Sequence, residues 1–235
     1  MSAEADTGAP RGAVHLDDAR QALGRGAAVV LPNPAPLTHV VTAIAPRTVN
    51  EAKARPPGRP VALWAHHPET LRTIAAVTEL DAAGTALAAR LLAEEHLTLL
   101  LPLRAGIRRP AWLAPACKDG RVLLFGARWR PLRPLLDAHP VLYVSSANRT
   151  GRPPAATTAE ALAMFPSTVP VLRAPHPDDE PAGGPARQAT TTVAVHPDGR
   201  LTLHRQGAQD RPHPHPDDYL GHLRARYAAR PPIVP

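Results

Sequence analysis

The stretch Leu97-Thr98-Leu99-Leu100-Leu101 is apolar at four of its five positions. An unbroken apolar run of this length is typical of a strand that is buried on both faces of a sheet. We therefore expect a central strand here. The two preceding segments, 68–77 and 81–95, have apolar residues at helical spacing, which predicts two helices packed on that sheet.

Further strands and helices alternate on both sides of this central strand. Apolar runs predict strands at 27–31, 60–64, 121–127, 141–145 and 169–173, and a hairpin at 190–195 and 201–205 around Pro197-Asp198-Gly199. Helical spacing predicts helices at 15–23, 48–54, 132–138 and 158–164, and the proline-rich segment 33–39 is expected to be a loop. The mixture indicates an α/β fold in which helices pack on a twisted mixed sheet.

The chain divides into three parts by composition. Residues 1–13 are expected to form a flexible leader, 14–208 a single domain, and 209–235 a Pro/His/Arg-rich tail. We interpret the tail as a disordered linker with at most a short helix at 218–227. Its His213-Pro214-His215-Pro216 motif holds alternate histidines in extended chain, so no metal site is expected.

Composition indicates the cellular compartment of the protein more clearly than its function. The single cysteine, Cys117, excludes an internal disulfide, and no apolar run is long enough to span a membrane, so a cytoplasmic protein is expected. The net charge of +7 comes almost entirely from arginine, since Lys53 and Lys118 are the only lysines. A basic surface attracts nucleic acid or phosphorylated ligands. An arginine-, alanine- and proline-rich chain is, however, also what a GC-rich coding bias produces, and we favour that explanation.

Two segments combine the residue types that bind phosphate. Lys53, Arg55 and Arg59 lie within seven residues, just before an expected strand, where they could neutralise a triphosphate. The alternative, a solvated basic loop, is favoured for this segment alone. The segment Val144–Gly151 runs from an apolar strand into Ser146-Ala147-Asn148, whose hydroxyl and amide groups could bind phosphate oxygens. A plain turn explains that segment equally well.

The order and spacing of these segments resemble those of the YrdC-like family, typified by threonylcarbamoyl-AMP synthase. No single block is decisive, but all are in register over residues 14–208. The blocks are Lys53–Val61 for K-x-R-P-x-x-x-P-L, His96–Pro102 for P-L-T-L-x-L-P, Phe125–Arg130 for V-x-V-R-x-P, Ser146–Gly151 for S-A-N-x-S-G, Thr191–Val193 for S-T-V, and Arg205–Gly207 for R-x-G.

The resemblance implies a fold, a reaction and a set of site residues. The fold is the YrdC-like single domain, of the type with a double-stranded-RNA-binding cleft. The reaction joins an amino acid, bicarbonate and ATP, with Mg²⁺ as a helper, into a carbamoyl-adenylate and releases pyrophosphate. It implies a transferase, specifically an ATP-binding nucleotidyltransferase. By this resemblance the catalytic residues are Lys53 and Arg55, the nucleotide-binding residues are Lys53, Arg55, Arg59, Ser146, Asn148 and Arg205, and the substrate-binding positions are Arg128, Thr191, Trp64 and Val144.

The chain departs from the family pattern mainly on the amino-acid side. The family's P-T-D-T-x-Y-G-L loop is replaced by Pro32–His39, and Trp64 stands where histidine is common. A pocket that loses its hydroxyl partners relaxes or redirects its choice of substrate. We therefore expect an acceptor other than threonine, in specialised metabolism such as antibiotic biosynthesis. A role in tRNA modification is the alternative, and we favour it slightly less.

Three kinds of partner and two other functions remain open from the sequence. The expected partners are the small-molecule amino acid and ATP, a downstream carbamoyl transferase and, as a weaker candidate, nucleic acid; no membrane partner is expected. The alternative functions are an RNA-binding module and a catalytically degenerate partner subunit.

Overall fold

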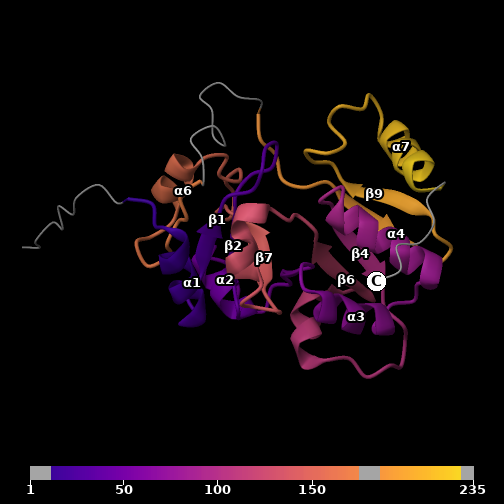
Figure 1. Cartoon of the computed structure of the whole chain (residues 1–235), viewed down its shortest axis with the longest axis horizontal. Coiled ribbons are helices and arrows are strands. Elements are labelled where there is room, and N and C mark those ends of the chain that lie inside the picture. The colour runs from indigo at the N-terminus through magenta and orange to yellow at the C-terminus, as the bar shows by residue number, and fades with distance from the viewer. Residues whose placement is uncertain (1–11, 175–185, 229–235) are drawn as a thin grey trace, which may run out of the picture.

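A nine-stranded sheet runs through the part of the chain that the computed structural model describes, residues 12–174 and 186–228 (Figure 1). The strand order is β1-β2-β7-β3-β6-β4-β8-β9, and β5 pairs with β6 outside this path. All pairs are antiparallel except β3 with β6 and β4 with β8. The predicted α/β fold with a mixed sheet is confirmed.

The elements follow one another in the predicted alternation. The strands are β1 (Val29–Leu31), β2 (Val40–Ala43), β3 (Ala62–Trp64), β4 (Thr98–Pro102), β5 (Cys117–Lys118), β6 (Arg121–Phe125), β7 (Tyr143–Ser146), β8 (Thr192–Val195) and β9 (Leu201–Arg205). The α-helices are α1 (Leu16–Gly24), α2 (Pro46–Ala52), α3 (Pro68–Val77), α4 (Ala82–Ala93), α5 (Arg133–Leu136), α6 (Thr158–Met164) and α7 (Pro216–Ala228), and the 3₁₀ turns are η1 (Ala111–Ala116) and η2 (Arg130–Leu132).

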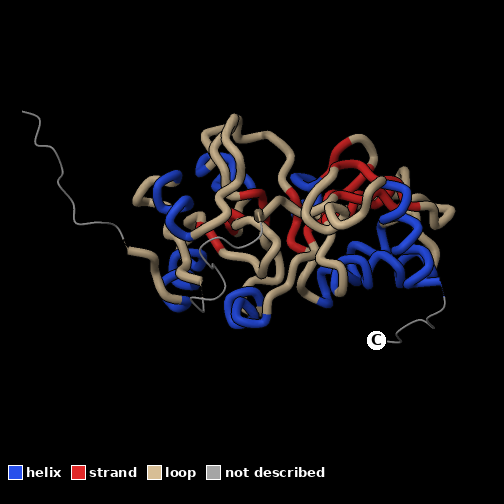
Figure 2. Tube along the Cα trace, turned by 90° about the horizontal axis from the view of Figure 1, so that it is seen from above, coloured by secondary structure: helices blue, strands red, loops and turns tan. Residues whose placement is uncertain are grey.

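The core consists of two clusters on opposite faces of the sheet. Successive side chains of a strand point to opposite faces, and β1 shows this directly. Val30 packs in the larger cluster with α3 and α4, whereas Val29 and Leu31 pack in the second cluster with α1. In the view of Figure 2 the strands lie inside the molecule and the helices toward its outside. Strand β4 lies between β6 and β8, so the prediction of a central strand is confirmed.

Two strand predictions need correction. Strand β2 was not predicted, because it follows directly on the proline-rich loop, yet all four of its residues are buried between β1 and β7. The expected strand at 169–173 is reduced to isolated bridges of Val171 and Leu172 to Val30 and Val14. Pro170 lies within it and has no N–H to donate to a ladder.

The tail is ordered up to residue 228. Helix α7 buries Tyr219, Leu220, Leu223 and Tyr227 in the larger core cluster, and it packs on β9 (Figure 1). The expected short helix is therefore present, and the interpretation of residues 209–228 as a disordered linker is wrong. Residues 1–11 of the predicted leader and 229–235 of the tail lie outside the described residues. None of the described helices is both long and apolar enough to cross a membrane.

Gly126 follows β6 at a point where three backbone groups approach it. A Cβ atom there would lie 2.6 Å from the Leu92 carbonyl oxygen and 2.7 Å from both Leu92 Cα and the Leu97 carbonyl oxygen. We expect Gly126→Ala to lower the free energy of unfolding by about 1–3 kcal/mol, as overpacking does. Gly24→Ala is the control, because nothing lies within 4 Å of a Cβ at Gly24. Urea denaturation of both variants measures the difference, and equal stabilities would contradict the close packing.

Candidate functional site

A cavity of about 310 Å³ lies where the ends of several strands meet. Its polar side chains come from the loop after α2, the end of β7, and strands β4, β8 and β9. The residues that line it are Asn33, Thr38, Val40, Arg55, Arg59, Pro60, Val61, Ala62, Thr98, Leu123, Phe125, Val144, Ser145, Ser146, Ala189, Thr190, Thr192, His204 and Arg205.

Lys53 lies at the back of this site, directly after α2. Its side chain is buried, with 3% exposure. The Nζ atom donates hydrogen bonds to the carbonyl of Ser146 and, over 2.7 Å, to Oδ1 of Asn148. Burial, with smaller contributions from Arg55 and Arg59, lowers the pKa of Lys53 to about 7. Since its acceptors are neutral, no carboxylate cancels the charge of the ammonium form.

Arg55 is held by a buried asparagine that the sequence analysis did not identify. Arg55 Nε donates to Oδ1 of Asn50, and Nδ2 of Asn50 donates to the carbonyls of Pro57 (2.8 Å) and Arg59 (2.9 Å). Asn50 thereby fixes the whole basic loop. Arg55 Nη2 is buried without a hydrogen-bond partner among the described residues, in a side chain that lines the cavity. An oxygen of a bound anion would satisfy this donor.

Ser146 and Asn148 lie at the end of β7, in contact with Lys53. Ser146 Oγ donates to Oδ1 of Asn148 over 2.6 Å, and Asn148 Nδ2 donates to the carbonyl of Arg152 over 2.8 Å. Ser146 lines the cavity, whereas Asn148 lies behind it. Asn148 therefore connects Lys53 to Ser146 and orients both.

Strands β4 and β8 contribute hydroxyl groups to the cavity. The Oγ1 atoms of Thr98 and Thr190 are 2.5 Å apart, and Thr192 also lines the cavity. Thr191, the predicted substrate residue, does not line it, because neighbouring side chains of an extended chain alternate in direction. Its side chain is fully buried, and its hydroxyl donates to Asp210 over 2.5 Å. Thr190 and Thr192 therefore replace Thr191 among the candidate substrate residues.

Three other sequence candidates reach the cavity. Arg59 and Arg205 line it with Val144, so cations from both ends of the site face the same space. Arg205 Nη2 also donates to the carbonyl of Thr190 over 3.1 Å, which ties the end of β9 to the start of β8.

The structure does not bring Trp64 or Arg128 to the cavity. Trp64 is fully buried, packs edge-on against Phe125 and satisfies its ring N–H on the carbonyl of Ala127. It therefore supports the cavity wall from behind. The guanidinium group of Arg128 lies beyond the end of β6, where it donates to the carbonyl of Ala65 over 2.9 Å. Neither residue remains a candidate for substrate contact in this conformation.

The loop that departs from the family pattern also supplies cavity residues. Asn33 is buried, lines the cavity with Thr38, and donates from Nδ2 to the Thr38 carbonyl over 2.8 Å. Arg187 Nη1 donates to the Asn33 carbonyl over 2.8 Å and so fixes the loop from outside. Asn33 and Thr98 were missed because polar residues near strands give no signal until a cavity is seen. Of the two, only Thr98 fell inside a block that carried the family resemblance.

A second cavity of about 560 Å³ adjoins the first and shares Thr38 and Ala189 with it. It combines apolar proline rings with side-chain amides and cations. The other residues that line it are Pro153, Pro154, Arg187, Gln188, Gln206, Gly207, Asp210, Arg211 and His213. Together the two cavities offer room for a ligand larger than either.

Comparison with known families decides the relationship. A family model for Sua5, YciO and YrdC proteins, described as "Telomere recombination", matches residues 23–207. The chain belongs to the Sua5/YciO/YrdC family. The family resemblance drawn from the sequence is thereby confirmed. No curated protein sequence matches the chain.

Solved structures share the fold at low sequence identity. P. abyssi Sua5 complexed with L-threonine is 18% identical, with a TM-score of 0.59 over 84% of this chain and 56% of that protein. E. coli YciO is 14% identical, with a TM-score of 0.58 over 83% and 90% of the two chains. Full-length HypF in a phosphate- and nucleotide-bound form is 15% identical, with a TM-score of 0.60 over 86% of this chain and 30% of HypF. The chain thus spans only part of the Sua5 and HypF proteins that it matches.

The lowered pKa of Lys53 gives the first test of the site. At pH 8 an amine with a pKa of about 7 is mostly uncharged, and a bound anion favours the ammonium form. We expect inorganic pyrophosphate to bind with uptake of up to about one proton at pH 8 and much less at pH 6. Calorimetry in buffers of different ionisation enthalpy measures this uptake.

Two variants identify the group that takes up the proton in that experiment. Lys53→Met should abolish the uptake, whereas His204→Ala, which removes an imidazole that lines the cavity, should preserve it. Undiminished uptake in Lys53→Met would show that the proton goes to a group other than Lys53.

Proposed function

We propose that this chain joins ATP, bicarbonate and an amine-bearing substrate into a carbamoyl-adenylate and releases pyrophosphate. One observation carries the proposal: Arg55, Arg59, Ser146 and Arg205 converge on one cavity, with Lys53 buried behind them. No Asp or Glu is among the described residues that line this cavity. Such a site attracts a polyanion and stabilises the charge that develops as pyrophosphate leaves.

The reaction needs positioning and charge neutralisation but no protein nucleophile. The amine attacks bicarbonate, and loss of water gives a carbamate. A carbamate oxygen then attacks the α-phosphorus of ATP, the bond to the β-phosphate oxygen breaks, and pyrophosphate departs. We propose that Lys53 and Arg55 hold the phosphate oxygens in line for this attack, with Arg59 and Arg205 at the mouth.

Mg²⁺ fits this site as part of the substrate. In the described parts of the chain, no group of three His, Cys, Asp or Glu side chains is placed to hold a metal ion. Mg²⁺ is commonly held through substrate phosphates together with water. We therefore propose that MgATP is the form that binds.

The second cavity suits the nucleoside of ATP. It adjoins the phosphate-binding cavity, and the rings of Pro153 and Pro154 could pack against a base while Gln188 and Gln206 offer amide groups to its edge. Small-molecule sites typically combine apolar surface with polar groups that fix the orientation of the ligand.

The acceptor is proposed to be an amine other than threonine. The cavity lining also includes the apolar residues Val40, Leu123, Phe125 and Val144. A carbamoyl transferase would then consume the reactive adenylate, in antibiotic biosynthesis or in tRNA modification. That P. abyssi Sua5 was solved with L-threonine supports an amino acid as the class of acceptor.

Asn148→Ala tests the proposed reaction. Removing the amide leaves Lys53 and Ser146 without their shared partner, so we expect kcat/KM for pyrophosphate formation to fall about 10²-fold or more. The assay supplies ATP, bicarbonate and a mixture of amino acids, and products are identified by mass spectrometry. Arg149→Ala, an exposed neighbour that does not line the cavity, is the control and should change little.

The same variant separates the alternatives. If Asn148→Ala loses adenylate formation but keeps RNA affinity, the enzyme is separated from an RNA-binding module. A wild-type protein that bound RNA and formed no adenylate would favour the RNA-binding module. A folded wild-type protein that bound no ATP in calorimetry would favour a catalytically degenerate partner subunit.

Screening single amino acids tests the acceptor. We expect at least one apolar amino acid to exceed threonine in kcat/KM by about tenfold or more, because the apolar residues of the lining favour an apolar side chain. The hydroxyl groups of Thr98 and Thr190 already bond to each other and leave less capacity for a substrate hydroxyl. If threonine gives the highest kcat/KM, the altered acceptor is wrong while adenylate formation stands.

A further inference from the structure

The segment that follows Gly207, where the family match ends, contacts both strands that carry the cavity threonines. Thr191 is its main contact on the β8 side. The backbone N–H of Thr191 donates to Oε1 of Gln209 (2.8 Å), and its hydroxyl donates to Oδ1 of Asp210 (2.5 Å). The backbone N–H groups of Gln209 and Asp210 donate back to the same hydroxyl, at 3.1 and 3.2 Å. The hydroxyl group and the backbone N–H of Thr191 are thus both hydrogen-bonded, and their partners are Gln209 and Asp210.

The turn that presents these residues is closely packed. Gly207 N donates to Asp210 Oδ1 over 2.7 Å, and Ala208 N donates to the Ala189 carbonyl over 2.9 Å. A Cβ atom at Gly207 would lie 2.4 Å from the Ala189 carbonyl oxygen and 2.4 Å from Thr191 N. Close packing and hydrogen bonds therefore fix the turn against the residues just before β8.

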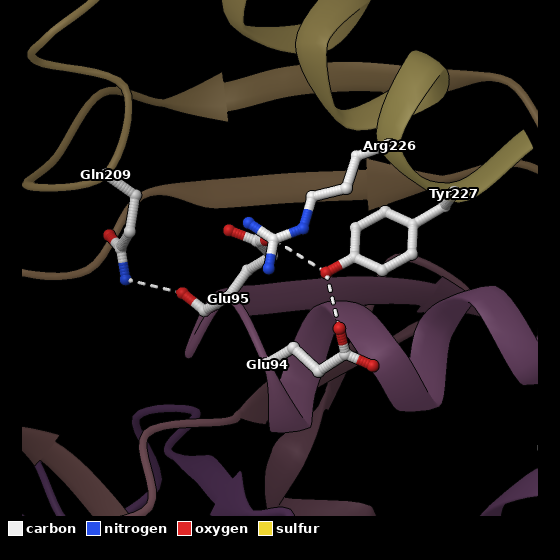
Figure 3. A network of polar contacts seen from close by, with 5 residues as sticks. All are labelled: Glu94, Glu95, Gln209, Arg226 and Tyr227. Carbon is white, nitrogen blue, oxygen red and sulfur yellow. Dashed lines mark hydrogen bonds and ion pairs between the residues drawn. The ribbon is translucent and has the colours of Figure 1, made fainter. Parts of the chain in front are cut away.

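Gln209 also reaches the corner before β4. Its Nε2 donates to the carbonyl of Glu95 over 3.2 Å (Figure 3). The same Nε2 donates to the carbonyl of His96 over 3.0 Å. Helix α7 holds the same corner, since Arg226 pairs with the Glu95 carboxylate over 3.0 Å and Tyr227 Oη donates to it over 2.6 Å (Figure 3). Thr98, which lines the cavity, lies two residues beyond this corner.

We infer, on the basis of the proposed function, that Gln209 and Asp210 are positioning residues for the acceptor side of the cavity. Holding Thr191 outward turns Thr190 and Thr192 inward, because side chains alternate along the strand. Strands β4 and β8 are paired directly, and Gln209 joins the residues just before each strand, at the end of the ladder where Thr190 contacts Thr98. Lys53 and Arg55 on the phosphate side are held instead by Asn148 and Asn50. Arg205 is the phosphate-side cation that contacts this region, through the Thr190 carbonyl.

The experiment compares Asp210→Ala with Asp210→Asn in the full chain. An asparagine keeps a side-chain oxygen that can accept from the Thr191 hydroxyl and the Gly207 N–H, whereas alanine removes it. Ile74→Ala, a buried change in α3 away from the cavity, is a control for lost stability alone. Pyrophosphate formation, calorimetric binding of inorganic pyrophosphate and amide hydrogen exchange are measured for each.

We expect Asp210→Ala to raise KM for the best amino acid about tenfold or more, since small misplacements are costly. Its Kd for pyrophosphate should change less than about threefold, Asp210→Asn should recover KM to within about threefold, and Ile74→Ala should leave KM unchanged. An unchanged KM in Asp210→Ala, or an equal loss in Asp210→Asn, would overturn the assignment.

Hydrogen exchange separates this inference from the proposed function. If the wild-type protein forms no pyrophosphate with any amino acid, the proposed function fails, but the exchange result still decides the positioning role. Faster exchange confined to residues 98 and 190–192 in Asp210→Ala supports it, and a uniform increase like that of Ile74→Ala overturns it.

Discussion

The hydrogen bonds of Lys53 to the end of β7 are the contact on which the site depends. They join two segments 93 to 95 residues apart, the end of α2 and the turn after β7. The acceptors are a carbonyl and an amide oxygen, so the lysine is held without being neutralised. Burial makes its charged form costly until an anion arrives, and the depressed pKa expresses that cost. Ordering of the basic loop by Asn50 and of the β7 turn by Asn148 supports the same contact from both sides.

The phosphate side of the site could be predicted from the sequence because it is carried by local motifs. Lys53, Arg55 and Arg59 lie in one short loop, and Ser146 and Asn148 lie in one short segment. Each motif can therefore be recognised in the sequence before the fold is known. Their convergence depended only on the strand order that a known family implies. The acceptor side could not be predicted in this way. Thr191 differs from Thr190 and Thr192 only in the direction of its side chain, and an error of one position reverses that direction.

Long-range packing accounts for the other failures. The β2 sequence Val40–Ala43 is short and follows three prolines, so its burial between β1 and β7 is a property of the sheet rather than of the segment. The tail looks polar by composition, since histidine, arginine and proline dominate it. Four side chains, spaced as on one helix face, nevertheless bury α7 against the core. Tertiary burial of a few positions outweighs composition in such a helix.

The burial of the central cation also bears on which ligand the site serves. Proteins that bind nucleic acid through its backbone place lysine and arginine where extended phosphates can reach them. Lys53 is 3% exposed and lies behind Arg55 and Ser146, so a duplex could reach the rim of the cavity but not this ammonium group. A buried ammonium group that no carboxylate pairs with is costly to maintain for rim contacts alone. The arrangement is therefore better matched to the terminal phosphates of a small molecule, which can enter a cavity of about 310 Å³, than to a polymer.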